Sequence, residues 1–361
     1  MDPTRPRLPI ALAVAAALVV SACAGIDLPT PSTSPAAATP TASPTATLAH
    51  SPEPLVVGLG YLPSVQFAPF YLADQRGYYS DAGLKVTLEN KIDSDLVPLV
   101  GQGQTDIGVA DGTSVIPARS QAIPIKYVAT IYAKFPSVVI ALSTSGIKTA
   151  TDLKGRRVGI PGRYGSSYVM LQALLRSANL TLDDITLVDF PDFTQAQGLA
   201  QGRVDAATGF VNNEPIQLKS LVPAGTDIVV LRVDAVTPLP GPGLIVGDTT
   251  LRTKAEAIRR FVAGTLRAMD EIAADPTVGL DAAIKQVPEF GKDQATKDTQ
   301  LAILDATIDT WKNDYTLAHG LGAIDRAAWS ASIDFMKTLE GLVPNPVSVD
   351  DVVATGLLPA P

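Results

Sequence analysis

LVVGLGYLPSVQFAPFYLADQRGYYSDAGLKVTL, residues 55–88, is a complete strand–helix–strand unit. The apolar run at 55–60 predicts a buried strand. A helix is predicted over 70–76, where Gly77 ends it, and the alternating segment 84–88 predicts a second strand. Strands that alternate with helices are typical of a mostly parallel sheet with helices on its faces. The stretch therefore predicts an α/β protein.

The alternation continues beyond residue 88 and then starts a second time. Strands are predicted over 107–110, 125–130, 138–142, 157–160, 185–188, 206–210, 229–232 and 244–246. Helices are predicted over 95–101, 113–121, 166–178, 194–201, 253–273, 277–285, 293–312 and 326–340. A short signature occurs in both runs, Gly103-Gln-Thr-Asp106 and Gly202-Arg-Val-Asp205, in which a helix ends at glycine and the chain turns at aspartate into a strand. The repetition predicts two lobes of similar build.

The chain is expected to cross between these two lobes twice. Residues 54–143 and 240–361 are assigned to lobe one, and residues 144–239 to lobe two. The roughly 300 residues after Pro54 are enough for two separate cores. Two crossings make a hinge, and a cleft is expected between the lobes.

The N-terminal region predicts export and membrane attachment. Cys23, the only cysteine, follows a basic start and an apolar run over 8–20, so residues 1–22 are predicted to be a signal peptide. Val20-Ser-Ala-Cys23 resembles the lipobox of bacterial lipoproteins, in which the cysteine is lipidated; an ordinary signal peptide with a chance cysteine is the alternative. Residues 23–53 are rich in Pro, Ser, Thr and Ala and predict a disordered tether. We therefore expect an extracytoplasmic protein that is anchored to the bacterial cell membrane through its lipid.

The composition argues against several classes of function. The chain has 36 acidic and 28 basic residues, a net charge of −8, which disfavours a nucleic-acid partner. Only two histidines are present, His50 and His319, too few for a histidine metal cluster. Neither the G-x-S-x-G nor the GxxxxGK[ST] motif occurs. We expect no catalytic residue, no metal and no cofactor, although a carboxylate pair could still do chemistry.

Residues that follow the strands are the candidates for a binding site, because ligands of open parallel sheets lie beyond the carboxyl ends of the strands. The candidates are Tyr61, Gln66, Phe67, Asp111, Tyr132, Arg163, Tyr164, Ser166, Asn213 and Glu214. Structural alternatives stay open for several of them. Ser166 is also placed to cap a helix, Phe67 to fill a core, and Arg163 to form an ion pair between the lobes. The segment 212–215, Asn-Asn-Glu-Pro, also fits a helix N-cap with proline in the first turn.

Glu214 distinguishes between classes of ligand. A site for a sulfonate or nitrate needs helix N-termini and arginine, without an acidic side chain. A carboxylate beside amides and tyrosines suits a neutral, flat heterocycle with N–H donors, whose faces stack on aromatic rings. The candidate residues therefore favour a heteroaromatic small molecule as the ligand.

Motifs between residues 54 and 250 resemble, in order, the solute-binding proteins of sulfonate, nitrate and thiamine-pyrimidine ABC importers. The motifs are Gly60-Tyr-Leu-Pro-Ser, Phe70-Tyr-Leu-Ala-Asp-Gln-Arg-Gly-Tyr-Tyr, Asp81-Ala-Gly-Leu-Lys-Val, Gly101 to Ala110, Asp152-Leu-Lys-Gly-Arg-Arg-Val-Gly-Ile-Pro-Gly and Gly202-Arg-Val-Asp205. The resemblance implies a periplasmic-binding-protein fold of the type-two kind. It also implies a protein, expected to be monomeric, that closes on its ligand and docks on a permease with its ATPase.

Two segments are most similar to the riboflavin branch of these proteins, with the thiamine-pyrimidine branch next. They are Gln66-Phe-Ala-Pro-Phe-Tyr and Asn212-Asn-Glu-Pro. The pyrimidine binders usually have Trp-x-Pro-Asn and a histidine after the first strand, where this chain has Tyr61-Leu-Pro-Ser and no histidine. A sulfonate-type binder and a ligand-sensing lipoprotein that does not transport remain alternatives. The eukaryotic pyrimidine-precursor synthase is similar in fold, but its histidines and cysteine-rich motif are missing here, so we do not expect an enzyme.

Overall fold

The computed structural model describes residues 51–233 and 238–359. The predicted signal peptide 1–22, Cys23 and the tether up to residue 50 lie outside the described residues. The first strand begins at Glu53, one residue before the expected start of lobe one. Within the described ranges, no helix combines the length and the apolar character that a membrane span needs.

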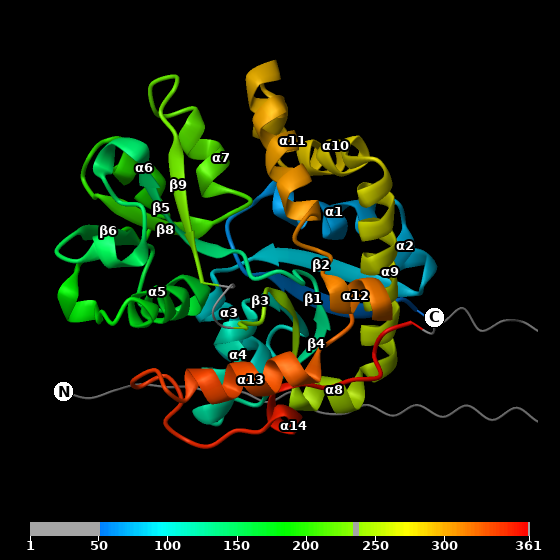
Figure 1. Ribbon diagram of the computed structural model, residues 1–361. Helices are drawn as coiled ribbons and strands as arrows, with labels where there is room; N and C mark the ends of the chain where they lie inside the picture. The colour runs from blue at the N-terminus through cyan, green and yellow to red at the C-terminus, as the bar shows by residue number, and fades with distance from the viewer. Residues whose placement is uncertain (1–50, 234–237, 360–361) are drawn as a thin grey trace, which may run out of the picture. The chain divides into compact units, whose positions relative to one another are not determined.

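The first sheet has five strands in the order β2-β1-β3-β10-β4 (Figure 1). Its strands are β1 (Glu53–Leu59), β2 (Leu84–Asn90), β3 (Ile107–Ala110), β4 (Ile125–Thr130) and β10 (Gly243–Gly247). β1 pairs in parallel with β2 and β3, whereas β10 runs antiparallel to both β3 and β4. The sheet is therefore mixed, because the strand that returns from the second lobe enters between two parallel-running neighbours. All residues of β3 and β10 are buried, as expected for central strands covered on both faces.

The second sheet repeats this plan with the order β7-β6-β8-β5-β9. Its strands are β5 (Ser137–Leu142), β6 (Arg157–Ile160), β7 (Thr186–Asp189), β8 (Ala206–Phe210) and β9 (Ile228–Arg232). β6 is parallel to β7 and β8, and β5 is antiparallel to β8 and β9. One reversed strand again lies between parallel-running neighbours, so the two lobes have the similar build that the repeated signature predicts.

The structure corrects one predicted lobe boundary. Residues 138–142 were expected in lobe one, with the boundary at 143/144, but β5 belongs to the second sheet, where it pairs with β8 and β9. The first crossing is therefore the segment 131–136, between β4 and β5. The second crossing lies between β9 and β10, and the expected boundary at 239/240 falls within it.

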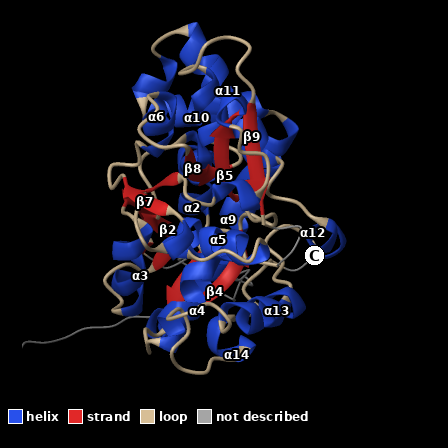
Figure 2. Ribbon diagram, turned by 60° about the vertical axis from the view of Figure 1, so that its left-hand side comes forward, coloured by secondary structure: helices blue, strands red, loops and turns tan. Residues whose placement is uncertain are grey.

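The helices connect the strands and cover the sheets. They are α1 (Ala68–Gln75), α2 (Tyr78–Asp81), α3 (Asp93–Gly101), α4 (Gly112–Ser120), α5 (Gly165–Ser177), α6 (Gln195–Ala200), α7 (Glu214–Lys219), α8 (Asp248–Thr253), α9 (Ala255–Ala274), α10 (Pro276–Gln286), α11 (Gln294–Ile308), α12 (Asp314–His319), α13 (Arg326–Met336) and α14 (Val349–Val352). Figure 2 shows α13 and α14 beside α4, far from them in the sequence. The sequence missed five short helices, α2, α7, α8, α12 and α14, because each has only one turn or slightly more, too few for a helical period to be visible.

The long helix α9 fixes the position of the segment that carries the first candidate residues. Its apolar stripe is buried, and Phe261, which is fully buried, stacks on Phe70 and Tyr79 at ring-centroid distances of 6.2 and 4.7 Å. These contacts hold α1 and α2 against α9, as Figure 1 shows. Because α1 follows directly on residues 61–67, the same packing positions that loop at the end of β1.

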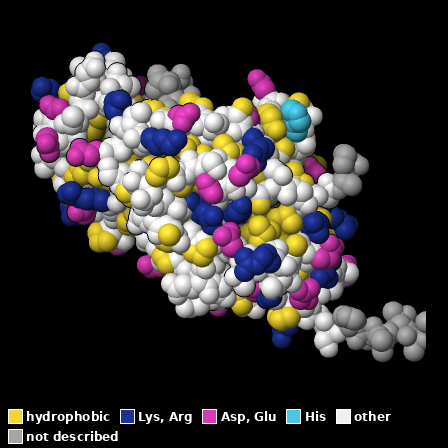
Figure 3. Space-filling model, turned by 90° about the horizontal axis from the view of Figure 1, so that it is seen from below, with side chains coloured by type: hydrophobic (Ala, Val, Ile, Leu, Met, Phe, Trp, Pro, Cys, Tyr) yellow, Lys and Arg dark blue, Asp and Glu magenta, His cyan; other side chains and the backbone are white. Residues whose placement is uncertain are grey.

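The face that carries α4, α8, α13 and α14 has acidic and basic side chains next to each other (Figure 3). Three ion pairs lie there: Arg119–Asp248 at 2.9 Å, Arg326–Asp350 at 2.6 Å and Lys337–Asp334 at 3.2 Å. Exposed pairs of this kind contribute about 0–1 kcal/mol to stability. On this face charges of both signs alternate, which differs from the broad basic field of a nucleic-acid-binding surface.

Candidate functional site

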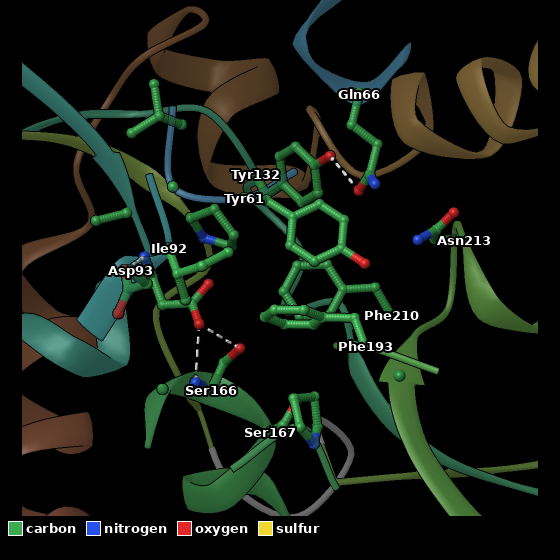
Figure 4. A pocket seen from close by; sticks show the side chains of 18 of the residues that line it. Tyr61, Gln66, Ile92, Asp93, Tyr132, Ser166, Ser167, Phe193, Phe210 and Asn213 are labelled. Carbon is green, nitrogen blue, oxygen red and sulfur yellow. Dashed lines mark hydrogen bonds between the residues drawn. The ribbon is translucent and has the colours of Figure 1, made fainter. Parts of the chain in front are cut away.

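Strands of both sheets end at one pocket. The empty volume of this pocket, including its open mouth, is about 930 Å³. Gly60 follows β1, Asp111 follows β3, Pro161 follows β6 and Phe210 ends β8, and all four line the pocket. Figure 4 shows that side chains from both lobes point toward this space. Ligands of open sheets lie beyond the carboxyl ends of the parallel strands, which we call the strand-end rule, and the pocket lies at that place.

The pocket brings together nine of the ten candidate residues. They are Tyr61, Gln66, Phe67, Asp111, Tyr132, Tyr164, Ser166, Asn213 and Glu214. Phe67 also contacts the core residue Phe70, with ring centroids 6.4 Å apart, so it has both of its expected roles as a lining and a packing residue. That these nine residues bind a ligand stays a prediction.

Arg163 is the candidate that the structure does not bring into the pocket wall. Its side chain is exposed and is not among the lining residues. The alternative role, an ion pair between the lobes, is not found for Arg163 among the described residues either. The next residue, Tyr164, turns toward the pocket instead, because the chain direction in this loop is set by Gly165 at a φ of +63°.

An acidic pair connects the two lobes at one wall of the pocket. Asp111 Oδ2 accepts hydrogen bonds from Ser166 N–H at 2.8 Å and Ser166 O–H at 2.7 Å, so lobe one binds the start of α5 in lobe two. Asp93 Oδ1 accepts from the Asp111 backbone N–H at 2.9 Å, and Asp93 Oδ2 accepts from Ser114 O–H at 2.6 Å. Burial, and next the Asp111 charge, raise the pKa of Asp93 to about 7; burial also raises the pKa of Asp111. Tyr164 is the N-cap residue of α5, so Ser166 does not cap that helix.

A second contact between the lobes is a buried polar network. Gln66 Oε1 accepts from Tyr132 O–H at 3.1 Å, which Figure 4 shows, and from Asn212 Nδ2 at 2.9 Å. The same Asn212 amide group donates to Thr307 Oγ1 at 2.9 Å. Asn212 is fully buried, and its Oδ1 has no hydrogen-bond partner among the described residues. The network ties the end of β8 to lobe one beside the first crossing.

Aromatic rings form the middle of the pocket. Tyr61 of lobe one and Phe193 of lobe two meet edge to face, with centroids 4.9 Å apart and planes at 89°. In Figure 4 the Tyr61 ring points toward Phe193 and Phe210. Phe193 has a φ of +59°, which is uncommon for a bulky residue and is typical of strained positions at functional sites. Burial, and next the nearby Glu214, raise the pKa of Tyr61, so its hydroxyl stays protonated.

Glu214 and Asn213 lie at the start of α7, on the side of the pocket opposite the Asp93–Asp111 pair. Glu214 Oε2 accepts from the Phe210 backbone N–H at 2.6 Å, and Asn213 Nδ2 donates to Glu214 Oε1 at 3.4 Å. Burial raises the pKa of Glu214 to about 7. Asn213 occupies the N-cap position and Pro215 lies in the first turn, but the Asn213 side chain makes no capping bond. Its Oδ1 instead accepts from Gln217 Nε2 at 2.7 Å, which leaves this amide at the pocket wall.

The sequence analysis did not identify several lining residues. Asp93 follows β2, Phe193 follows β7 and Phe210 ends β8, so the strand-end rule applied to every strand would have selected all three. Gln195, at the start of α6, carries no such signal in the sequence. Among the described residues no group of three or more His, Cys, Asp or Glu is arranged to hold a metal ion.

Two α/β lobes, joined by two crossings and with a pocket at their strand ends, define a periplasmic-binding-protein fold. A ligand-binding component of an ABC-type import system from Staphylococcus aureus is similar, with a TM-score of 0.63, 15% identity and coverage of 84% of this chain and 97% of that one. The alkanesulfonate-binding protein SsuA from Xanthomonas axonopodis pv. citri gives a TM-score of 0.65 at 17% identity, covering 85% of this chain and 100% of that one. The chain belongs to the NMT1/THI5-like family, whose model matches residues 64–278.

Two relatives of this chain have names that state different functions. The riboflavin-binding protein RibY of Chloroflexus aurantiacus is 32% identical over 354 residues, which cover 97% of each chain. A 4-amino-5-hydroxymethyl-2-methylpyrimidine phosphate synthase of Aspergillus parasiticus is 26% identical over 235 residues, covering 62% of this chain and 68% of that one. The first similarity spans both lobes, and the second is more distant.

Proposed function

We propose that this protein is the solute-binding component of an ABC importer and that it captures a neutral, flat heteroaromatic compound, with riboflavin as the first choice. The observation that carries this proposal is the chemistry of the pocket wall. Aromatic rings line its middle, carboxyl and amide groups lie around them, and none of the lining residues that the structure describes is a lysine, arginine or histidine. Such a wall suits stacking and hydrogen bonding to an uncharged ring system.

The isoalloxazine ring of riboflavin fits this chemistry. Its pyrimidine edge carries one N–H between two carbonyl oxygens. The Glu214 carboxylate would accept from that N–H, and the Asn213 amide would donate to a carbonyl beside it. Tyr61, Tyr164 and Phe193 offer rings for the faces.

Capture by hinge closure follows from the distribution of these residues. Tyr61 belongs to lobe one, whereas Phe193, Asn213 and Glu214 belong to lobe two. A ligand that touches both sets binds the closed arrangement more tightly than the open one, and this difference in affinity shifts the population toward closure. The closed form would then dock on a permease.

The relatives support this choice of ligand and set the alternatives. RibY is named for riboflavin binding and spans the whole chain, which supports a flavin. The named synthase makes a pyrimidine phosphate, so the corresponding aminopyrimidine is the second ligand to test. The sulfonate-binding neighbour shares 17% identity and therefore supports the fold alone.

Membrane attachment through lipid on Cys23 belongs to the same proposal. Two acyl chains on this cysteine would hold the protein stably at the membrane, whereas one chain gives only reversible binding. Mass spectrometry of the membrane fraction should find the diacylglyceryl group on wild-type protein and not on Cys23→Ser. Detection of an unmodified N-terminal segment in the membrane fraction would contradict the anchor.

The experiment that tests the ligand is a titration of the purified full chain with riboflavin at pH 8, read by flavin fluorescence. Quenching with a dissociation constant of about 1 μM or less, a usual range for a specific site, would support the proposal. Absence of quenching by riboflavin, together with a thermal shift by the aminopyrimidine, would replace riboflavin with that ligand. Uptake in cells with and without a cognate permease then separates transport from sensing.

Glu214→Ala should weaken riboflavin binding by about ten-fold or more, since a hydrogen bond to a charged group contributes about 1.5–3 kcal/mol. Glu214→Gln should lose less, because it keeps an acceptor and loses only the charge. The exposed Glu340→Ala serves as the control and should bind like the wild type. Equal affinity of all three variants would remove Glu214 from the site.

A further inference from the structure

Within residues 51–233 and 238–359, the charged side chains that line the pocket are all acidic. They are Asp93, Asp111 and Glu214. The acidic pair lies at one wall and Glu214 at another. After the larger effect of burial, the charges of Asp93, Asp95 and Asp111 raise the pKa of Tyr164, and the Glu214 charge raises the pKa of Tyr61. A ligand in the pocket is therefore near a carboxyl group whichever of its two ends faces the acidic pair.

The acidic pair keeps an acceptor for a ligand. Asp93 uses both of its oxygens, one for the Asp111 N–H and one for the Ser114 hydroxyl. Asp111 uses Oδ2 for the two donors of Ser166, while its Oδ1 accepts no hydrogen bond from the described residues. The residue is partly exposed and lines the pocket. This oxygen can accept a hydroxyl or N–H group of a ligand but would repel an anionic oxygen.

Gln195 gives a second and independent indication of a ligand with donor groups. It lines the same pocket and is 1% exposed. Its Nε2 donates to the Thr208 carbonyl at 3.2 Å, but its Oε1 has no partner among the described residues. A buried acceptor without a donor is costly, so a donor from a ligand would remove that cost.

We infer that this site selects neutral, hydroxyl-bearing ligands and rejects their phosphomonoesters and sulfonates, with Asp93 and Asp111 as specificity-determining residues. The inference rests on the proposed function, because it concerns the same pocket. A phosphate site uses free N–H groups at helix N-termini and arginine. Here the Ser166 N–H at the start of α5 is already bound by Asp111, and the lining residues that the structure describes include no arginine. For flavins, the chain would bind riboflavin and exclude riboflavin 5′-phosphate. The hydroxyls of the ribityl chain would supply donors to Asp111 Oδ1 and Gln195 Oε1.

The test compares riboflavin with riboflavin 5′-phosphate, both titrated by fluorescence into the full chain at pH 8, where the phosphate carries a charge of about −2. We expect riboflavin to bind about 100-fold more tightly, because like charges placed together in a binding site are strongly unfavourable. Asp93→Asn and Asp111→Asn should each reduce this ratio about ten-fold. Glu340→Gln, which removes an exposed carboxylate outside the pocket lining, should leave the ratio within about two-fold and is the control.

The outcomes separate this inference from the proposed ligand. Equal binding of both flavins, or a ratio that neither aspartate variant changes, would overturn the selectivity while riboflavin binding stands. If neither flavin binds, riboflavin is the wrong ligand, and 4-amino-5-hydroxymethyl-2-methylpyrimidine and its phosphate are compared in the same way by thermal shift. Binding of the alcohol alone would then support the selectivity, and binding of the phosphate, or of neither compound, would overturn it.

Discussion

Asp93→Asn is expected to stabilise this protein more and more as the pH rises. Its gain in the free energy of unfolding over the wild type should grow by about 2 kcal/mol between pH 5 and pH 8. Burial and the neighbouring Asp111 charge raise the pKa of Asp93 from 3.8 to about 7 in the folded protein. Asparagine has a similar shape, keeps an acceptor for the Asp111 N–H, and does not ionise.

The sign follows from proton binding in the two states. Below about pH 4 the aspartate is protonated in both the folded and the unfolded chain, so its ionisation costs no stability. Between about pH 4 and pH 7 the unfolded chain loses this proton first, and stability falls as the pH rises. Above about pH 7 the loss is complete and constant. Each unit by which the pKa is raised corresponds to about 1.4 kcal/mol, and the sharing of charge with Asp111 reduces the total.

Urea unfolding at pH 5, 6.5 and 8 measures this effect, with Asp95→Asn as the control. Asp95 lies in the same first turn of α3 but is exposed, so its variant should show the same small difference from wild type at each pH. A difference between Asp93→Asn and wild type that does not change with pH would show that Asp93 ionises normally in the fold.

An acidic pair with one buried member, Asp93, that lowers stability at neutral pH is informative about function. Local rules of folding favour neutral or ion-paired side chains at such positions, and proteins depart from these rules mainly at functional sites. Here the cost falls on the wall of the pocket, which both aspartates line and where Asp111 binds the start of α5. The same aspartates that would determine selectivity are thus expected to lower the stability of the empty protein.

Sequence patterns were sufficient for the strands and the longer helices of the fold. The strands 107–110, 125–130, 157–160 and 206–210 have the predicted bounds. Each is a short apolar run that begins after a polar or turn residue, so its limits are set by neighbours in the sequence. Pairing was harder to predict. The run at 138–142 follows β4 without a helix between them, which suggested the same sheet, but its partners β8 and β9 lie more than sixty residues later.

The candidate site likewise has a part that the sequence predicts and a part that it does not. Nine candidates line the pocket because the strand-end rule depends only on where parallel strands stop. The direction of a side chain in a loop depends on backbone angles that no period encodes. Arg163 therefore points to solvent. Phe193 follows a strand end, but its contact with Tyr61, made at a φ of +59°, has no signal in the sequence.

Gly165→Val is expected to weaken ligand binding by about 10- to 100-fold, which corresponds to the usual cost of about 1–3 kcal/mol for an overpacked contact. Gly165 is the first residue of α5, and a Cβ added to it would lie 3.1 Å from Asp111 Oδ2, the atom that binds Ser166. The branched valine side chain would extend beyond this Cβ and press the lobes apart where they meet. A ligand that needs both lobes would then bind a less populated closed form.

The variant Gly155→Val separates the effect of backbone strain from the effect of pressing the lobes apart. Gly155 has a φ of +73°, close to the +63° of Gly165, but no atom lies within 4 Å of its added Cβ. Both variants should lose about 1–2 kcal/mol of stability, because a left-handed backbone disfavours a residue with a Cβ. Only Gly165→Val should also lose affinity in the flavin titration. Equal affinities of the two variants would mean that the contact between Asp111 and Ser166 opens when the ligand binds, and that closure depends on the Gln66–Asn212 network instead.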